Sequence, residues 1–479
     1  MILLKILLKN FLNMKNIDIA IINPHNNKIV LRDFYSSTIS KGLYNWPNVD
    51  LLCISGHLKD QYNVKLIDAN TNNLNSTNVA NMLKDHDLKG IIFSVGKSVL
   101  DDDYNFIKDV KKKINKKFKI LVVGGIIYYN ALDEIKNNNF IDACILNFTT
   151  NDILKYFNND FENLNNFVYK NSDGEIINKD LKLPENNFKI PVPLHNHLNL
   201  KYYQLSHGTS NHLTSVLTSY GCVHKCSFCV SGKINFRYRD VDNILDELEY
   251  LNELGVKEIT FRDNIFGFHK RIYKDLLNKI IVKKYKFKWF SDSRVDILDE
   301  EMIILMSKAG CYALHFGIET ESEKTLNKYE KNLKDTSYIR NTIELCKKHG
   351  IQTVGYFILG LPGEKKQDVE RTIDYSIKIG VDYASFNLPI PIVGTELRKN
   401  SIENDWIDSN ANINYDGSNM PIITTEHISA PELLNFRKKA YQRFYFRFKF
   451  VLFTLKNLKG FFQLKMIFFE FINLVFFKR

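Results

Sequence analysis

Cysteine is scarce in this chain of 479 residues, which contains only seven. Four of them, Cys53, Cys144, Cys311 and Cys346, stand alone in apolar segments, and the total is odd. A disulfide-stapled fold needs cysteines in pairs within a short chain, whereas a chain of this length can bury enough core without them. The sequence therefore argues against a disulfide scaffold and favours a reducing, cytoplasmic location with two or three domains.

Long apolar runs are also missing. No segment approaches the roughly 20 uninterrupted apolar residues that a membrane-spanning helix needs. The N-terminal stretch MILLKILLKNFLNMK is broken by Lys5 and Lys9, and it has neither a basic leading region nor a small-residue cleavage site. We therefore do not interpret it as a signal peptide.

Acidic residues are nearly absent from the C-terminal segment. From Arg437 to Arg479 the chain has eleven Lys and Arg but one acid, Glu470, so this segment carries ten of the eleven net positive charges. Phe, Leu and Ile alternate with these cations, which predicts a basic amphipathic helix. It would either contact the inner face of an anionic membrane or dock on its own domain. Nucleic acid is not an expected partner, because so many aliphatic side chains at helical spacing fit base stacking poorly.

Apolar runs rich in Ile and Val alternate with helical patterns along the first part of the chain. This rhythm predicts an α/β domain with a doubly wound, Rossmann-type parallel sheet over residues 15–155. Its ligand crevice would lie at the carboxyl ends of the strands. The predicted strands are 17–24, 62–70, 89–96, 118–125 and 141–147.

A second series of strand and helix patterns follows a polar segment, 156–212, that is rich in Asn, Lys and Pro and that we interpret as a linker. Six βα units predict a partial (β/α)6 TIM-type barrel over 213–400, with its chemistry at the C-terminal ends of the strands. A helical, basic region, 401–479, completes the chain. The predicted barrel strands are 213–219, 256–263, 287–293, 312–319, 352–360 and 383–389.

Three of the seven cysteines follow the first predicted barrel strand, in the stretch TSYGCVHKCSFCV. Cys222, Cys226 and Cys229 have the spacing C-x3-C-x2-C and can converge on one soft metal site. Structural zinc normally takes four ligands in two pairs, but no second pair follows, and His224 between two of the cysteines would strain a tetrahedron. Three thiolates can instead hold a 4Fe–4S cluster and leave its fourth iron open. A zinc-stabilised binding module remains the alternative.

With this spacing, and with Phe228 before the last cysteine, the chain resembles the radical S-adenosylmethionine (SAM) enzymes over about residues 213–399. The resemblance implies that SAM chelates the open iron through its amino and carboxylate groups. One electron, supplied by a donor such as flavodoxin or ferredoxin, then breaks a carbon–sulfur bond of SAM. The resulting 5'-deoxyadenosyl radical abstracts hydrogen from the substrate.

Further positions resemble the SAM site of this family, and three of them, Asp263, Arg294 and Glu319, lie at predicted strand ends. Asp263 would accept from the SAM ammonium, and Glu319 from the ammonium or the ribose hydroxyls, while Arg294 and Lys331 would orient the carboxylate. Asp263 could instead cap a helix, and Lys331 could be a solvated charge. The segment GYFILGLPGE resembles the adenine-binding strand of this family, with an apolar strand edge at Ile358 and a close backbone approach at Gly360.

The segments INP, GG, GIET, GLPGE and PIPIVGTEL, with a doubly wound domain upstream, narrow the resemblance to radical SAM proteins with an N-terminal cobalamin-binding-type domain. Two features depart from that pattern. The D-x-H-x-x-G motif that marks a histidine ligand of cobalt is absent, and Asn147-Phe148 replace the usual Gly-Glu. Cobalamin could bind without a protein ligand to cobalt, or the domain could be a retained shell.

The resemblance implies an enzyme that acts on an unactivated C–H bond of a hydrophobic, lipid-like small molecule. Cobalamin-dependent methyl transfer is the preferred reaction. The alternative is a cobalamin-independent cyclase, coupling or rearrangement enzyme.

Overall fold

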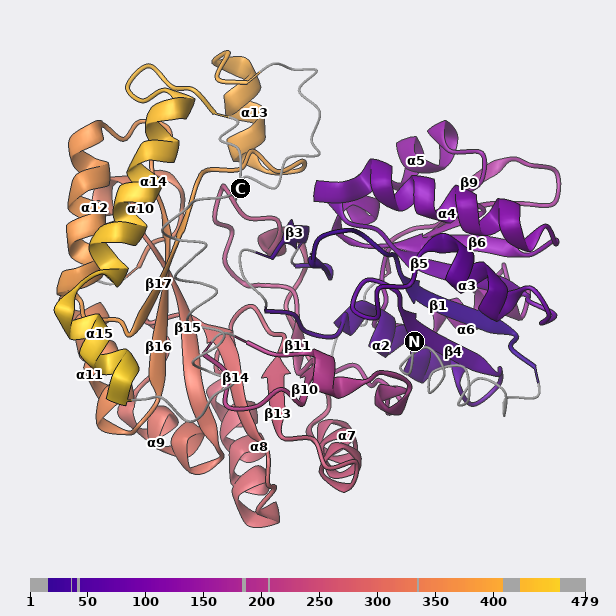
Figure 1. Cartoon of the computed structure of the whole chain (residues 1–479), viewed down its shortest axis with the longest axis horizontal. Helices are drawn as coiled ribbons and strands as arrows, with labels where there is room; N and C mark the ends of the chain where they lie inside the picture. The colour runs from indigo at the N-terminus through magenta and orange to yellow at the C-terminus, as the bar shows by residue number, and fades with distance from the viewer. Residues whose placement is uncertain are drawn as a thin grey trace. The chain divides into compact units, whose positions relative to one another are not determined.

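The computed structural model describes residues 16–35, 37–40, 44–182, 187–205, 207–333, 336–407 and 423–456. The chain divides into two compact units, Met1–Ser40 with Asn45–Tyr203, and Lys41–Tyr44 with Gln204–Arg479. Each unit is built around one main sheet with helices against it (Figure 1). The predicted α/β class is confirmed.

The sheet of the first unit has the strand order β4-β1-β5-β6-β7-β8-β9. Its first five strands are parallel and coincide with the five that the sequence predicts. They read as continuous apolar runs because helices cover both faces of the sheet. The strands are β1 (Ile19–Asn23), β4 (Val64–Asp68), β5 (Gly90–Ser94), β6 (Lys119–Val123), β7 (Ala143–Ile145), β8 (Phe167–Lys170) and β9 (Ile176–Asn178).

Helices pack on both faces of this sheet. One face buries a large apolar cluster under α3 (Ser76–Leu83), α4 (Leu100–Ile114) and α5 (Gly125–Asn137). The helices α2 (Val49–Leu58) and α6 (Asp152–Phe157) contact each other, and α2 also contacts β1 and β4. The chain thus winds in both directions from β1, which places a topological switch point between β1 and β5.

Part of the segment predicted as a linker belongs to this sheet. The strands β8 and β9 lie within 156–212, and β8 pairs antiparallel with β7. Their turn is organised by Asn171, whose Oδ1 accepts from the backbone N–H groups of Asp173 and Glu175 at 3.0 and 2.8 Å. The abundance of Asn and Lys suggested a linker, but here asparagine closes a hairpin.

The second unit contains six parallel strands in chain order, as predicted for a partial barrel. Helices line the outer face of the strands (Figure 1). The strands are β10 (Leu213–Val216), β13 (Glu258–Phe261), β14 (Lys288–Ser293), β15 (Cys311–Glu319), β16 (Gln352–Ile358) and β17 (Tyr383–Asn387). The helices are α7 (Val241–Glu253), α8 (Lys270–Lys283), α9 (Glu300–Lys308), α11 (Thr336–Lys348) and α12 (Lys366–Lys378).

The C-terminal region is helical where the structure describes it, in α13 (Glu396–Glu403), α14 (Ala430–Tyr445) and α15 (Phe448–Lys456). The α14 helix packs on α12 and β17, and the Tyr445 hydroxyl donates to the Ala384 carbonyl at 2.6 Å. From α15, Phe450 and Phe453 contact the ring of Tyr383. The start of the basic segment therefore docks on its own domain, and 457–479 lie outside the described residues. Within the described part of the chain, no helix is long and apolar enough to cross a membrane.

Candidate functional site

The cysteine loop is closed at its base by a short antiparallel pair, β11 (Ser219–Tyr220) with β12 (Arg237–Tyr238). The Cys222 N–H donates to the Ile234 carbonyl at 3.2 Å. Gly221 has φ +86°, and a Cβ there would lie 2.6 Å from the Ile234 and Asn235 carbonyl oxygens. Only glycine fits this position, which turns the chain into the loop at the end of the first barrel strand.

Asp263 fixes the start of the cysteine loop. Its buried carboxylate accepts from the backbone N–H groups of Thr218 at 2.9 Å and Ser219 at 3.0 Å, and from the Tyr273 hydroxyl at 2.7 Å. It also accepts a short bond from the Thr218 hydroxyl. Burial raises the pKa of Asp263, and these hydrogen bonds lower it. The chain's own donors thus contact both oxygens and fix the start of the cysteine loop, while the SAM contact of Asp263 stays a prediction.

Two buried cations approach the cysteine loop. The Arg294 side chain donates from Nε and Nη2 to Asp296 at 2.9 and 2.7 Å, and from Nη2 to the Lys331 carbonyl at 3.0 Å. Its Nη1 is buried and has no hydrogen-bond partner among the described residues. Lys331 Nζ lies 2.8 Å from Glu319 Oε1. The structure therefore brings together Arg294, Lys331 and Glu319, which the sequence predicted for one site.

The two cations affect the pKa values of the thiols in the loop. The pKa of Cys226 is raised to about 11, chiefly by burial, although the positive charges of Lys331 and Arg294 offset part of that rise. Burial also raises the pKa of Cys222, and the His224 N–H, 3.4 Å from Sγ, offsets part of this rise. Cations beside thiols favour thiolates, the form that binds metal. Across the described ranges, no three His, Cys, Asp or Glu side chains already stand in metal-ligand geometry.

Glu319 has an unusual backbone conformation for its residue type. Its φ is +68°, and the register of β15 against β16 shifts between Gly317 and Glu319. A Cβ at Gly317 would lie 2.5 Å from Glu319 Oε1 and 2.8 Å from Lys331 Nζ. A non-glycine residue in the left-handed region costs energy and is found where the side chain must be aimed. The glycine and the bulge together direct this ion pair.

An apolar cluster borders the other side of the loop. Phe228 and Ile358 are partly buried against it, and the Ser227 N–H donates to the Tyr329 carbonyl at 3.0 Å. Gly360 has φ +78°, but its N–H donates to Glu364 at 3.1 Å, and a Cβ there would meet Leu433 of α14 at 2.2 Å. The close approach at Gly360 is therefore to the chain itself. The cluster consists of Tyr329, Leu361, Leu397, Ile407 and Ile423.

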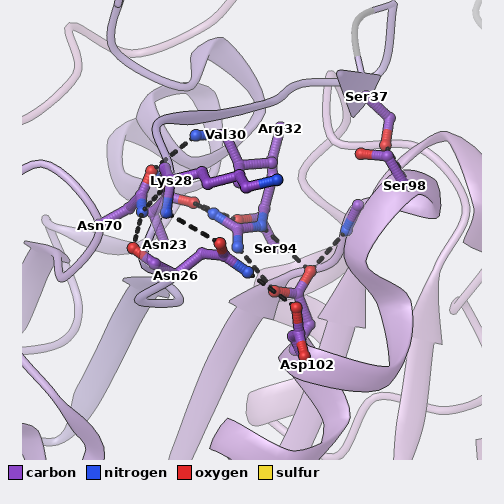
Figure 2. A network of polar contacts seen from close by, with 12 residues as sticks. Asn23, Asn26, Lys28, Val30, Arg32, Ser37, Asn70, Ser94, Ser98 and Asp102 are labelled. Atoms are coloured by element: carbon purple, nitrogen blue, oxygen red, sulfur yellow. Dashed lines mark hydrogen bonds and ion pairs between the residues drawn. The ribbon is translucent and has the colours of Figure 1, made fainter. Parts of the chain in front are cut away.

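The crevice of the first unit holds a buried ion pair (Figure 2). At the carboxyl ends of β1 and β5, Arg32 Nη2 lies 2.7 Å from Asp103 Oδ1, and both side chains are 0% exposed. Arg32 Nη1 and Ser94 Oγ donate to Asn23 Oδ1 at 3.1 and 3.2 Å. Arg32 ends the first strand of a hairpin that the sequence did not predict, β2 (Val30–Arg32) with β3 (Ser37–Ile39). The chain's own side chains thus fill the switch point.

The GG segment of the first unit also meets the chain itself. A Cβ at Gly124 would lie 2.3 Å from the Val95 carbonyl oxygen, and one at Gly125 would lie 2.8 Å from that of Phe34. Phe148 is buried with its ring 6.2 Å from that of Phe34. Both glycines are therefore explained by backbone packing.

Comparisons with known proteins support the resemblance found for the second unit. Residues 216–376 match the radical SAM superfamily. The chain is 27% identical over 414 residues to the uncharacterized methyltransferase PH0819 of Pyrococcus horikoshii, covering 84% of this chain and 88% of that protein. The matched segment contains the three cysteines, which favours an iron–sulfur site over the zinc-stabilised module.

Two solved structures share the fold. TsrM from Kitasatospora setae, a radical SAM methyltransferase with cobalamin and a 4Fe–4S cluster bound, has a TM-score of 0.61 at 16% identity, over 78% of this chain and 72% of that one. OxsB, a cobalamin-dependent SAM radical enzyme, has a TM-score of 0.61 at 16% identity, over 87% of this chain and 59% of that one. The doubly wound unit followed by the barrel is thus an arrangement of elements found in both.

Proposed function

Since residues 216–376 form a domain of the radical SAM superfamily, we propose that Cys222, Cys226 and Cys229 hold its cluster and that the enzyme methylates an unactivated carbon of a hydrophobic small molecule. The observation that carries the site is that three cysteines share one loop and that the charges of Arg294 and Lys331 act on its thiols. When bound, the cluster supplies the electron that breaks a carbon–sulfur bond of SAM.

The residues around the loop fit this pair of cofactors. The three thiols are the soft donors that iron–sulfur clusters take, and they would draw closer as the cluster binds. Arg294 Nη1 is a buried donor in need of an acceptor, which the carboxylate of SAM supplies. Glu319, held by Lys331, presents a carboxylate for the ammonium or the ribose hydroxyls. Phe228 and Ile358 offer apolar surface for the adenine.

Cobalamin is proposed as a further cofactor because the first unit has the doubly wound fold and because TsrM and OxsB contain cobalamin. We assign it no ligand residue, since Arg32 and Asp103 already fill the switch point. A cobalamin-independent cyclisation, coupling or rearrangement is the alternative reaction.

Loading experiments separate these alternatives. The chain is reconstituted anaerobically with iron and sulfide, incubated with hydroxocobalamin and desalted, and then given SAM and a reductant. Methyl transfer predicts that the corrinoid absorption stays with the protein and that S-adenosylhomocysteine accumulates. SAM cleavage without retained corrinoid would contradict the cobalamin proposal and support the alternative reaction.

Glu319→Gln should weaken SAM binding. The variant keeps the shape of the side chain but removes the charge that Lys331 aligns, so the loss should be about 1.5–3 kcal/mol, the worth of a hydrogen bond to a charged group. This corresponds to roughly a 10- to 140-fold rise in the dissociation constant. Isothermal calorimetry on the reconstituted proteins measures it. Glu321→Gln, which removes an exposed partner of Arg371, is the matched control, and equal affinities in both variants would remove Glu319 from the site.

A radical SAM enzyme needs an electron donor, and we propose flavodoxin or ferredoxin for this role. The C-terminal helices offer a second proposed contact, with a membrane surface. Four apolar side chains at the end of α14 and on α15 are exposed: Phe446, Phe448, Val451 and Leu452 are 45, 75, 46 and 45% exposed. They accompany a basic segment, a combination suited to the surface of an anionic membrane.

The membrane proposal predicts co-sedimentation of the full chain with anionic vesicles. Each Lys or Arg near such a surface contributes about 1 kcal/mol, which salt screens, while the exposed apolar side chains supply a salt-resistant part. Binding to neutral vesicles should be weaker, and a chain ending near Pro431 should not bind. That truncation removes most of α14, so cluster content is measured in parallel. A full-length chain that ignores anionic vesicles would leave α14 and α15 as packing elements only.

A further inference from the structure

A row of polar side chains crosses the inner face of the barrel. Successive side chains of a strand point to opposite faces, and Trp289 of β14 points outward, donating from Nε1 to the Ala309 carbonyl at 2.8 Å. Asp292, three residues on, therefore points inward, and it pairs in register with His315 of β15. Arg262 follows β13 and Tyr356 lies on β16. No local sequence pattern marks this row, because three of its members are single residues on separate strands and Arg262 directly follows β13.

The four side chains form one connected network. His315 Nδ1 lies 3.2 Å from Asp292 Oδ1 and 2.8 Å from the Tyr356 hydroxyl. Arg262 Nη1 lies 3.9 Å from Asp292 Oδ2. The Arg262 and His315 side chains are each 7% exposed, whereas that of Asp292 is 32% exposed. Asp292 and Tyr356 are thus the partly exposed members of the network, whereas Arg262 and His315 are buried.

The network is fixed from one side by rings. Phe290 stacks on His315 with a centroid distance of 5.1 Å, and His207 Nε2 lies 3.0 Å from His315 Nε2. Burial lowers the pKa of His207 to about 3, so this ring is neutral at physiological pH. Both nitrogens of His315 are therefore engaged, and Asp292 is held by a side chain that cannot easily turn away.

Two members of the network are also neighbours, in the sequence, of residues at the proposed SAM site. Arg262 directly precedes Asp263, which anchors the cysteine loop, and Asp292 lies two residues before Arg294. A substrate carbon must come close to SAM at the carboxyl ends of the strands. A polar anchor inside the barrel would determine which carbon is presented there.

A purely structural role explains these contacts less well. A carboxylate that only served as the structural partner of a buried cation would be buried with it, whereas that of Asp292 is 32% exposed. We propose that Asp292, aligned by His315 and flanked by Arg262 and Tyr356, is a binding subsite for a hydrogen-bond-donating group of the substrate, a hydroxyl or an amine. The inference rests on the proposed function and refines it, since the hydrophobic substrate then carries a polar end.

Small matched probes test the subsite without the natural substrate. Benzylamine, benzyl alcohol, benzoate and toluene have the same ring but differ in the group attached to it. Ligand-observed saturation-transfer NMR on the reconstituted full chain ranks their affinities. Benzylamine and benzyl alcohol should bind, and benzoate and toluene should bind several times more weakly, because Asp292 repels an anion and gains nothing from a methyl group.

Asp292→Asn should lower the affinity for benzylamine about tenfold or more, since a hydrogen bond to a charged acceptor is lost. The control is Asp275→Asn on the outer helix α8, where the carboxylate is 51% exposed and pairs with Lys279. It should bind benzylamine as the wild type does.

Equal binding of benzoate and benzylamine to the wild type, or unchanged benzylamine affinity in Asp292→Asn, would overturn the subsite. If that variant fails to load its cluster, the ranking of the four probes by the wild type still decides whether the subsite exists. SAM cleavage by the wild type is measured separately. Its absence would refute the proposed function, while the probe ranking would continue to test the subsite.

Discussion

Replacing Cys222, Cys226 or Cys229 by alanine should abolish the iron–sulfur absorption and SAM cleavage together. Three thiolates hold three irons of a 4Fe–4S cluster, and two are too few to keep it. His224 does not offer a replacement ligand, because it is confined between Cys222 and Cys226 on the same loop. We therefore expect a complete loss in each variant rather than a partial one.

Cys311→Ala is the matched control for these variants. Cys311 is a buried thiol of the same unit, but it begins β15, and burial raises its pKa well above the usual range. The control should keep the cluster absorption and SAM cleavage and lose only some stability. SAM cleavage that persists in Cys226→Ala would show that the cluster lies elsewhere.

Asp103→Asn should destabilise the first unit by about 3–5 kcal/mol, the cost of leaving one charge of a buried ion pair without its partner. Arg32 and Asp103 are both 0% exposed, so the guanidinium cannot turn to water. Asp103 also accepts from the Gly96 N–H at 2.8 Å, which ties α4 to the end of β5. Urea unfolding of the full chain, followed by hydrogen exchange of β1 and β5, measures the change.

Asp109→Asn on the same helix provides the comparison. Its carboxylate is 57% exposed and pairs with Lys113 at 3.1 Å, so its loss should cost less than about 1 kcal/mol. Equal effects of the two substitutions would mean that the Arg32–Asp103 pair does not hold the crevice together.

Periodicity and apolar runs predicted the strands of both sheets, because parallel strands covered by helices on their faces are continuous apolar segments. The hairpins could not be predicted in this way. The β2–β3 pair is short, and its main contact is the Arg32 guanidinium, whose partner Asp103 lies 71 residues away. Strand β8 likewise carries Asn and Lys nearby, which suggested a linker.

The sequence likewise predicted some features of the candidate site and not others. Spacing alone located the three cysteines. Strand ends indicated Arg294 and Glu319, and the family resemblance indicated Lys331. The structure brings these last three residues together. Asp263 also lies at a strand end, but the sequence does not show that Thr218, Ser219 and Tyr273 satisfy its carboxylate. Whether a predicted ligand is already engaged depends on contacts between distant segments, which no local pattern encodes.

Formation of 5'-deoxyadenosine tests the central claim most directly. The chain, reconstituted anaerobically with iron and sulfide, is incubated with SAM and dithionite, and the products are separated by liquid chromatography. A zinc-loaded sample serves as the control. Radical cleavage of SAM predicts 5'-deoxyadenosine from the iron-loaded protein and none from the zinc-loaded protein. An intact cluster on Cys222, Cys226 and Cys229 that leaves SAM uncleaved would contradict it.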